Sequence, residues 1–315
     1  MIPDNKKIAI VGTGMVGMSF AYALLNQSIC DEICLIDINK IKARGEAMDL
    51  THGLPFAPHN IKIYAGEYKD CRDMDLVVIC AGAPQMAGET RRDLVQKNYI
   101  VFKSIVPAIV DNGFKGIFLV ATNPVDVMTK LVLDLSGFDA GRVFGTGTSL
   151  DTARLRFILS EYFEVNPNNI HTYVLGEHGD SEFVAWSSAF ISSTPLMEYK
   201  AENSNLNFEL DNIARRVKRS AYEIIRAKKV TCYGIGMVLA RLASAILHDE
   251  NSIFTVSAYL HGEYCKKGAY IGVPAIINRN GVKKIIEVEL NEKEREQFDY
   301  SFKVILDMLR EIDSK

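Results

Sequence analysis

The sequence predicts an α/β protein with a doubly wound parallel sheet in its first half and an α+β region after it. Three observations support this fold class. Short, continuous apolar runs alternate with helical patterns as far as Gly145. Continuous apolar runs are typical of strands that are buried on both faces. Beyond Gly145 the pattern changes to longer helices followed by antiparallel-type strands. We therefore expect one domain over residues 1–145 and a second over residues 146–315.

The expected elements follow from the periodicity of the apolar residues. In the first half, strands are expected at 8–11, 32–36, 61–64, 76–80 and 117–120, and helices at 14–27, 40–52 and 93–112. In the second half, helices are expected at 150–163, 213–228, 235–248 and 292–312, and strands at 170–175, 253–260, 270–278 and 282–288. Doubly wound sheets bind ligands in the crevice at the carboxyl ends of their strands, so functional residues should follow the strands.

Composition and charge exclude several classes of function. The 315 residues carry a formal net charge of −3, which gives no reason to expect nucleic acid or an acidic membrane as a partner. No signal-peptide pattern opens the chain and the longest apolar stretch, 76–81, is too short to span a bilayer, so we expect no membrane association and a cytoplasmic location. The six cysteines are expected to be reduced thiols. Cys30 and Cys34 form only half of a typical structural zinc site, so no metal is expected.

A glycine-rich turn follows the first expected strand. Residues 12–17 read Gly-Thr-Gly-Met-Val-Gly, and Asp37 ends the second strand twenty positions after Gly17. Gly12 permits the tight turn, Gly14 admits the pyrophosphate of a dinucleotide, and Gly17 lets the helix pack closely on the strand. Asp37 would accept hydrogen bonds from ribose hydroxyls and repel a 2′-phosphate, which favours NAD over NADP. The simpler alternative is a glycine-rich turn with an unrelated aspartate.

Polar residues that do not suit a core lie in four separated segments, 85–92, 122–124, 151–154 and 176–180. His178 suits proton transfer because an unperturbed histidine titrates near neutral pH. Asp151 would orient the imidazole and stabilise its charged form. Arg154 lies three positions after Asp151 on a helix, so the two share a face, and its guanidinium could bind a substrate carboxylate through two hydrogen bonds.

These groups suit the oxidation of a 2-hydroxyacid, in which a hydride passes to a nicotinamide while a base takes the hydroxyl proton. Arg91 would polarise the carbonyl oxygen from a loop that closes over the substrate. Asn123 would hold the same oxygen and help to fix the nicotinamide. Each residue also has a structural explanation: a surface histidine, a solvated arginine pair, or an aspartate favoured by the helix dipole. The combination beside the expected crevice favours catalysis.

The chain resembles the lactate/malate dehydrogenase family over essentially its whole length. The matching motifs are residues 12–17, Asp37, 81–83, 85–91, 121–124, 150–154, 176–180 and Thr231. The resemblance implies a Rossmann NAD-binding domain, with His178 as proton acceptor, Asp151 as its partner, Arg154 as the carboxylate clamp and Arg91 as the polarising residue. It also implies cofactor contacts from residues that their context alone would not single out: Val16, Lys42, Tyr68, Gly82, Ala83, Ser104, Ala121, Asn123 and Thr146.

Substrate choice depends chiefly on Gln85. By the resemblance, malate enzymes carry an arginine at this position, which pairs with the second carboxylate of oxaloacetate. The neutral Gln85 offers no such partner, and burying an unpaired carboxylate is costly. Gln85 with Thr231 resembles the lactate pattern, so pyruvate and lactate are the expected substrates. The alternatives are malate, a bulkier 2-hydroxyacid, or a non-catalytic NAD-binding protein.

Arg156 and His171 form a candidate regulatory pair. Arg156 lies two positions beyond Arg154, about 200° around the helix, so it faces away from the substrate. From the residues alone, the simpler interpretation is a surface arginine and a surface histidine. By the resemblance, bacterial lactate dehydrogenases with Arg and His at these positions bind fructose 1,6-bisphosphate at a subunit interface. The chain also begins almost at its first strand, as the bacterial type does. We therefore expect a homotetramer that this sugar bisphosphate activates.

Overall fold

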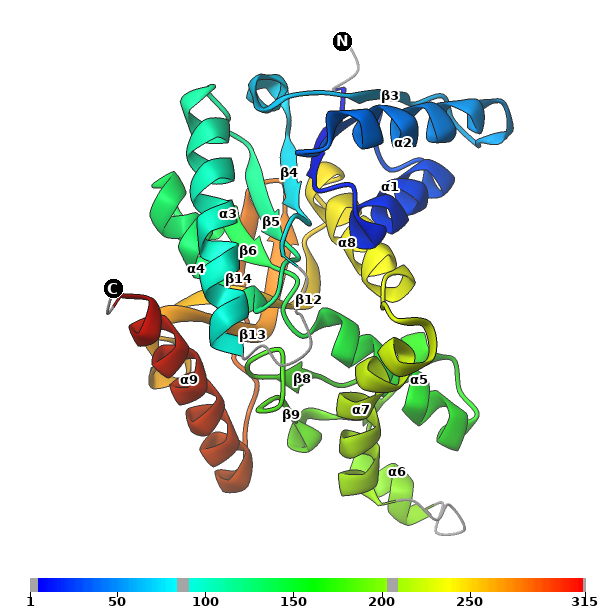
Figure 1. Ribbon diagram of the computed structural model, residues 1–315. Helices are drawn as coiled ribbons and strands as arrows, with labels where there is room; N and C mark the ends of the chain where they lie inside the picture. The colour runs from blue at the N-terminus through cyan, green and yellow to red at the C-terminus, as the bar shows by residue number, and fades with distance from the viewer. Residues whose placement is uncertain (1–4, 84–90, 203–208, 314–315) are drawn as a thin grey trace.

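The computed structural model describes residues 5–83, 91–202 and 209–313. Its centre is a nine-stranded sheet (Figure 1). Six of these strands are parallel, in the order β3-β2-β1-β4-β5-β6. They are β1 Lys7–Val11, β2 Glu32–Ile36, β3 Lys62–Ala65, β4 Leu76–Ile79, β5 Ile117–Val120 and β6 Val143–Gly145. The order reverses between β1 and β4, which is the point where a doubly wound sheet opens a ligand crevice.

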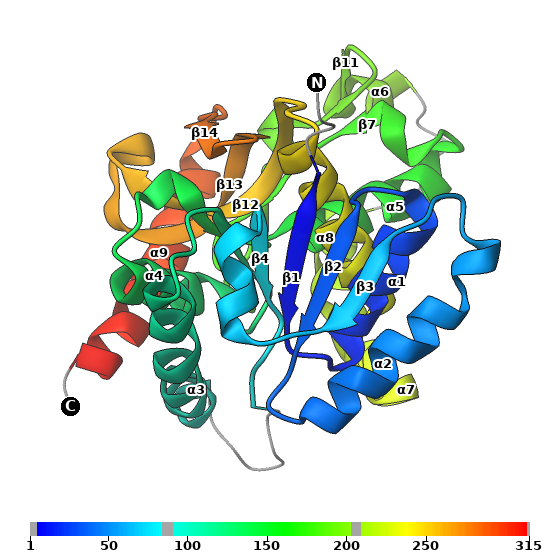
Figure 2. The same cartoon turned by 90° about the horizontal axis from the view of Figure 1, so that it is seen from above.

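Alternate residues of the parallel strands face two separate cores. Ile8 and Ile10 of β1 belong to a core with α1 and α8, whereas Ala9 and Val11 belong to a core with α3 and α4. Successive strand side chains point to opposite faces, so runs that are apolar at every position require a helix layer on each side (Figure 2). The helices of these layers are α1 Met15–Gln27, α2 Lys40–His52, α3 Arg91–Asp111, α4 Val125–Ser136 and α8 Tyr233–Leu247.

Three strands of the second half extend the same sheet. β12 Ser252–His261 joins β6 through the pair Ser257 and Gly145, and β13 Lys267–Asn278 and β14 Gly281–Ile285 follow in antiparallel order. The antiparallel strands were expected, but their addition to the first sheet was not. The sheet therefore continues across the division that the sequence pattern predicts at residue 145.

The remaining elements form a third core beneath the sheet in the view of Figure 1. Its helices are α5 Ser149–Phe163, α6 Leu196–Glu202 and α7 Leu210–Lys228, and its short strands are β7 Ile170–His171, β8 Val174–Leu175, β9 Phe183–Val184, β10 Phe190–Ile191 and β11 Thr194–Pro195. The prediction of one strand over 170–175 was wrong, because its two ends pair with different partners, β7 with β10 and β8 with β9. Helix α9 Glu292–Asp313 packs against α3, α4 and β13.

Two expectations from composition can be compared with the fold. All six cysteines lie within the described residues and all six are free thiols. Across the described ranges, no helix combines the length and the hydropathy that a membrane crossing requires.

Candidate active site

The glycine-rich turn has the geometry of a phosphate cradle. Gly12 has φ of 104°, and a Cβ there would lie 2.5 Å from the backbone nitrogen of Ala81, so only glycine fits. A Cβ on Gly17 would overlap the carbonyl oxygen of Gly12, so this glycine lets α1 pack on the turn. At Gly14, by contrast, nothing described lies within 4 Å of the Cβ position, and Gly14 caps α1 without a side-chain hydrogen bond. The first N–H groups of α1 are therefore available to an anion.

Asp37 follows β2 and is held in place by backbone groups. Its carboxylate accepts hydrogen bonds from the backbone N–H and hydroxyl of Thr13, at 2.8 and 2.9 Å, and from the N–H of Asn39 at 2.9 Å. Burial alone would raise the pKa of Asp37, but the N–H groups of Asn39 and Thr13 outweigh burial and lower it. A fixed negative charge here suits ribose hydroxyls and disfavours a 2′-phosphate.

A cavity of about 880 Å³ runs along this crevice. Its lining includes eight of the predicted cofactor residues: Gly12, Gly14, Asp37, Lys42, Tyr68, Gly82, Ala83 and Ser104. Five others do not line it: Val16, Gly17, Ala121, Asn123 and Thr146. Ile38, which no sequence motif singles out, also lines the cavity and is 100% exposed. An apolar residue directly after Asp37, outside any strand or helix, was the signal that could have identified it.

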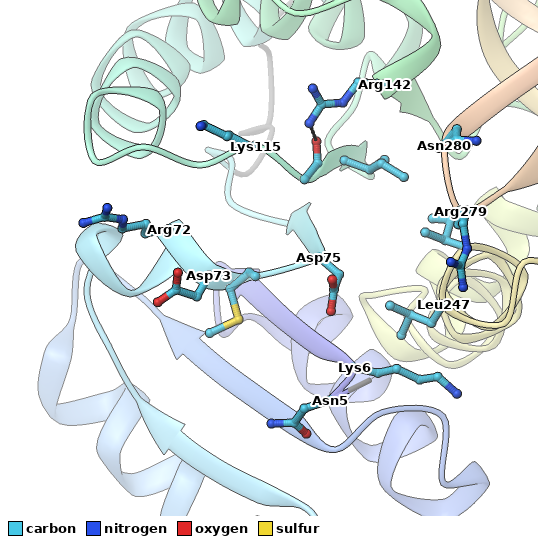
Figure 3. A pocket seen from close by; sticks show the side chains of 14 residues that line it. Asn5, Lys6, Arg72, Asp73, Asp75, Lys115, Arg142, Leu247, Arg279 and Asn280 are labelled. Atoms are coloured by element: carbon cyan, nitrogen blue, oxygen red, sulfur yellow. Dashed lines mark hydrogen bonds between the residues drawn. The ribbon is translucent and has the colours of Figure 1, made fainter. Parts of the chain in front are cut away.

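A second cavity, of about 660 Å³, lies at the amino ends of the strands (Figure 3). Lys6, Arg72 and Lys115 line it, but Figure 3 shows the charged group of Lys6 pointing to the opposite side from those of Arg72 and Lys115. Arg142 also lines it and donates to the carbonyl of Gly116 at 2.6 Å. Because ligands of doubly wound sheets bind at the carboxyl ends, the cavity beside the glycine turn is the candidate cofactor site.

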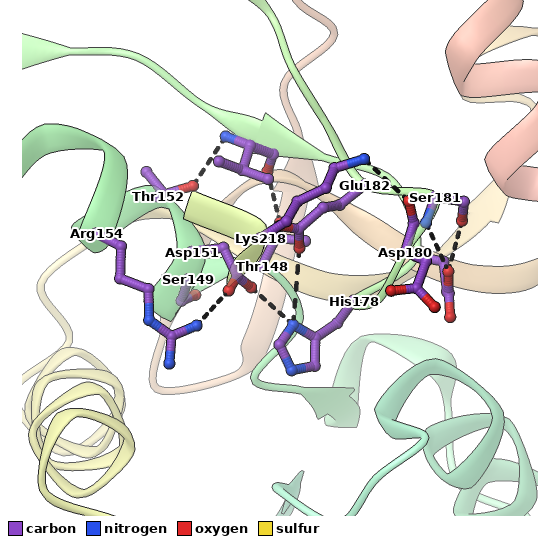
Figure 4. A network of polar contacts seen from close by, with 12 residues as sticks. Thr148, Ser149, Asp151, Thr152, Arg154, His178, Asp180, Ser181, Glu182 and Lys218 are labelled. Atoms are coloured by element: carbon purple, nitrogen blue, oxygen red, sulfur yellow. Dashed lines mark hydrogen bonds and ion pairs between the residues drawn. The ribbon is translucent and has the colours of Figure 1, made fainter. Parts of the chain in front are cut away.

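The predicted catalytic groups of α5 meet the loop that follows β8 (Figure 4). The Nδ1 atom of His178 lies 2.7 Å from Oδ2 of Asp151, and Arg154 donates to Oδ1 of the same carboxylate at 2.6 Å. The side chain of Asp151 is 3% exposed, whereas that of His178 is 25% exposed. Since the spacing of three residues brings Asp151 and Arg154 together, the expectation that they share a helix face is confirmed.

Electrostatics favour a charged imidazole in this network. Burial alone would lower the pKa of His178, but the charge of Asp151 and the hydrogen bond to it raise that pKa to about 9. Burial opposes the charge of Asp151 as well, yet His178 and Arg154 lower its pKa. At neutral pH the network therefore contains an imidazolium, a carboxylate and a guanidinium, and His178 is set to donate a proton.

Three buried residues of the site escaped the sequence analysis. Asp126 of α4 accepts hydrogen bonds from the backbone N–H of His178 at 3.0 Å and from the hydroxyl of Ser257 at 2.5 Å. It therefore links the end of β5 to the catalytic loop. Asn98 of α3 accepts from the N–H of Ala83 at 2.7 Å and donates to the carbonyl of Asn123 at 2.9 Å, which joins two crevice loops. Glu182 lies 4.0 Å from His178. Asn98 and Asp126 lie within helices and Glu182 lies just before β9, and none of the three carries a local sequence signal of its tertiary contact.

Several predicted residues are less closely defined. Gln85 lies outside the described residues, and of Arg91 only the backbone, at the start of α3, is described. Thr231 lies half-buried between α7 and α8, and Asn123 is exposed in the loop between β5 and α4. The guanidinium of Arg156 donates weakly to the carbonyl of Thr172, at 3.5 Å, one residue after His171.

Comparisons with known proteins agree with this geometry. The family profile described as the lactate/malate dehydrogenase NAD-binding domain matches residues 6–145, and that described as the lactate/malate dehydrogenase alpha/beta C-terminal domain matches residues 148–315. An L-lactate dehydrogenase of Geobacillus sp. (strain WCH70) is 54% identical over 304 residues, which cover 96% of this chain and 95% of the relative. An L-lactate dehydrogenase 2 of Bacillus anthracis is 52% identical over 300 residues, which cover 95% and 96%.

Solved structures give the same result. A lactate dehydrogenase from a Medee basin deep-sea metagenome library superposes with a TM-score of 0.96 at 48% identity, covering 98% of this chain and 99% of the other. The minor L-lactate dehydrogenase of Enterococcus mundtii in its ligands-bound form gives 0.95 at 44% identity, covering 97% and 98%. Its ligands-unbound form gives 0.89 at 43% identity, covering 98% and 99%.

Proposed function

Because the chain belongs to the lactate/malate dehydrogenase family, we propose that it interconverts (S)-lactate and pyruvate, as an L-lactate dehydrogenase. The chain is an NAD-dependent oxidoreductase that acts on a CH–OH group. The observation that carries the proposal is the 2.7 Å contact between His178 and the buried Asp151, which prepares a proton carrier beside the dinucleotide crevice. The open space at Gly14 and the charge of Asp37 fit the pyrophosphate and the ribose of NAD.

The residues of the network divide the work of the reaction. The glycine turn and Asp37 would hold NAD, which would supply the acceptor for the hydride of C2 of lactate. His178 takes the hydroxyl proton on Nε2, and Asp151 stabilises the resulting imidazolium through Nδ1. In the direction of pyruvate reduction the same proton returns to the oxygen. Arg154 binds the substrate carboxylate with the N–H groups that Asp151 does not occupy, while Arg91 polarises the carbonyl and Asn123 holds its oxygen.

The choice of substrate is tested at Gln85. We expect the wild-type chain to reduce pyruvate far better than oxaloacetate, because a neutral side chain leaves a second carboxylate unpaired. Gln85→Arg should shift the preference toward oxaloacetate. Steady-state NADH oxidation on both acids measures this, and equal or faster wild-type turnover of oxaloacetate would contradict the lactate proposal in favour of a malate dehydrogenase.

A non-catalytic NAD-binding protein is the alternative from another class. The variant His178→Ala separates the two, because it removes the proton carrier and leaves the glycine turn intact. Under the proposal, NADH binding by fluorescence is retained while pyruvate reduction is lost. Activity that survives this substitution would refute the role of His178.

Activation by fructose 1,6-bisphosphate is supported by the surroundings of Arg156. Its Nε atom and the hydroxyl of Thr172 are buried without a hydrogen-bond partner among the residues that the structure describes. Burial lowers the pKa of Arg156, and no ion pair with a carboxylate is found for it within the described ranges. A half-buried, uncompensated cation that contacts the carbonyl of Thr172, the residue after the exposed His171, suits a phosphate. Pyruvate saturation curves with and without the sugar bisphosphate, in wild type and in Arg156→Gln, test this: the activation should vanish in the variant.

A homotetramer is the assembly we propose, with the cytoplasm as its location. Helices α1 and α8 pack together and leave Tyr22, Tyr233 and Met237 more than half exposed, and Met48 of α2 and Tyr222 of α7 are exposed as well. Exposed apolar side chains on neighbouring helices favour an interface between subunits. Six free thiols suit a reducing compartment. Sedimentation velocity with and without fructose 1,6-bisphosphate measures the assembly, and a monomer under both conditions would contradict it.

A further inference from the structure

Glu182 is a second carboxyl group directed at the imidazole of His178. It lies four residues after His178, and the chain turns back between them, with the N–H of Glu182 donating to the carbonyl of Gly179 at 3.3 Å. This turn brings Oε2 of Glu182 to 4.0 Å from Nδ1, the same nitrogen that Asp151 binds (Figure 4). The side chain of Glu182 is 4% exposed. A carboxyl group so deeply buried requires a specific reason, because burying it is costly.

The reason is not an ordinary hydrogen bond. Within the described ranges, no hydrogen bond to the carboxyl group of Glu182 is found, and its ionic contact is with His178. Burial and the charge of Asp151 raise the pKa of Glu182 well above its usual range, while His178, Lys218 and Arg154 act in the opposite direction. The carboxyl group of Glu182 therefore keeps its proton to a higher pH than an ordinary glutamate does.

Glu182 also lines a cavity of about 360 Å³ between β9, α7 and the start of α9. Asp151 and Arg154 do not line this cavity, so it gives Glu182 contact with a space that is separate from the substrate side of the network. Lys218 lines it and donates to the carbonyl of Asp180 at 2.9 Å. A proton can leave Glu182 into this cavity without crossing the substrate site.

We propose that Glu182 is a positioning residue for the proton-transfer step, which shares with Asp151 the control of the charge on His178. The proposal rests on the role of His178 in the proposed function. When Glu182 loses its proton, the new carboxylate faces the imidazole ring at 4.0 Å and favours the charged form of His178. Two negative groups then hold the imidazole in its charged form, and pyruvate reduction extends to higher pH.

The charged and titratable groups around Glu182 come from every element packed against it. They are Asp126 on α4, Asp151 and Arg154 on α5, Glu177, His178 and Asp180 in the catalytic loop, Asp211 and Lys218 on α7, and Lys293 and Glu294 on α9. Glu294 is 3% exposed and its carboxyl group accepts from the N–H of Ser187 at 3.0 Å. It is a buried carboxyl of the same cavity that does not contact His178, which makes it a matched control.

The test is the pH dependence of both directions of the reaction in Glu182→Gln, with Glu294→Gln as control. An isosteric amide keeps the volume but cannot become charged. We expect the upper pH midpoint of kcat/KM for pyruvate to fall by about 1 unit, the size typical of a charge at this distance. Lactate oxidation should rise by up to about tenfold in the alkaline range where Glu182 is charged in the wild type, because the imidazole of the amide variant loses its proton earlier. A purely structural role would lower both directions and leave the midpoint in place.

Two further measurements keep the proposal falsifiable if Glu182→Gln does not fold. The variant Glu182→Asp keeps the charge but moves it away from Nδ1, so its midpoint should lie between those of wild type and the amide. In the wild-type chain and in Asp126→Asn, ¹³C NMR of the histidine rings, with His178→Gln to assign the signal, should show His178 responding to a second, coupled protonation step that the removal of the Asp126 carboxylate does not abolish. A single step, or a midpoint equal to wild type in both variants, would overturn the proposal. The NMR titration does not require the enzyme to be active. If the chain is inactive but His178 shows the coupled step, the proposed function is refuted, whereas the coupling between Glu182 and His178 still holds.

Discussion

The charge of Asp151 can be removed with little change in volume by the substitution Asp151→Asn. Asp151 is 3% exposed and contacts His178 at 2.7 Å and Arg154 at 2.6 Å, so both partners lose a buried counterion. The pKa of His178 should then fall from about 9 toward its ordinary value of 6.5, or below it because of the unpaired Arg154. At 1.36 kcal/mol per unit, this difference is about 3 kcal/mol in favour of the neutral imidazole.

The consequence for pyruvate reduction follows from the fraction of His178 that carries a proton. At pH 7.5 nearly all of the wild-type imidazole is protonated, but only about one tenth would be in the variant, so kcat/KM falls at least tenfold. An amide can also favour the wrong tautomer of the ring, which increases the loss.

The assay is the initial rate of NADH oxidation between pH 5 and 10. In Asp151→Asn the activity should recover partly at acid pH, because His178 is protonated again there, while NADH binding stays unchanged. The variant Asp37→Asn, whose residue lies in the cofactor crevice, is the control, since it should weaken NADH binding without moving the midpoint of the pH profile. A variant of Asp151 that keeps a midpoint near that of wild type would refute the electrostatic reasoning.

The remaining predictions concern stability and the cofactor. Burial raises the pKa of Asp126 to about 7, so its contribution to stability is fully present below the unfolded pKa of about 3.8 and is lost as the pH rises through 7. The free energy of unfolding of Asp126→Asn minus that of wild type should therefore increase by up to roughly 3 kcal/mol from pH 5 to pH 8.5, as measured by urea denaturation. If this difference between variant and wild type is the same at both pH values, Asp126 does not become a buried charge. Gly17→Ala should lower the free energy of unfolding by about 1–3 kcal/mol because its Cβ would overlap Gly12, whereas Gly14→Ala should leave the Tm unchanged and weaken NADH binding. Equal thermal stability of the two variants would contradict that distinction. Asp37→Ser should narrow the preference for NADH over NADPH, and an unchanged ratio of the two Kd values would remove Asp37 from cofactor selection.

The sequence was most informative where a local pattern has a direct physical meaning. Apolar runs predicted β1, β2 and β5 to within a residue, because a strand that is buried on both faces must be apolar throughout. The glycines at 12, 14 and 17 predicted the turn because their backbone geometry excludes a Cβ at two of the three positions. The helical spacing of Asp151 and Arg154 predicted their contact in the same way.

The local pattern of apolar residues could not predict which distant segments pair with one another. The strand expected over 170–175 divides into β7 and β8, because its two ends pair with different strands, β10 and β9. Similarly, β12 has the pattern of any antiparallel strand, and only its pairing with Gly145 shows that it continues the first sheet. Register and strand order depend on which surfaces meet, which single-strand periodicity does not record.

The difference between what the sequence determines and what the tertiary structure determines is clearest in the active site. By itself, the sequence determined which chemistry the chain carries: a dinucleotide turn, an acidic residue for the ribose, and a histidine with an aspartate and an arginine of suitable type. Only the tertiary structure decided how strongly that histidine holds its proton. The buried Asp126 and Glu182 come from a helix and a turn that sequence alone does not place beside His178, and the pKa of an imidazole depends on distances and burial. Residue types therefore specify the reaction, whereas the three-dimensional arrangement of charges specifies the pH range in which it runs.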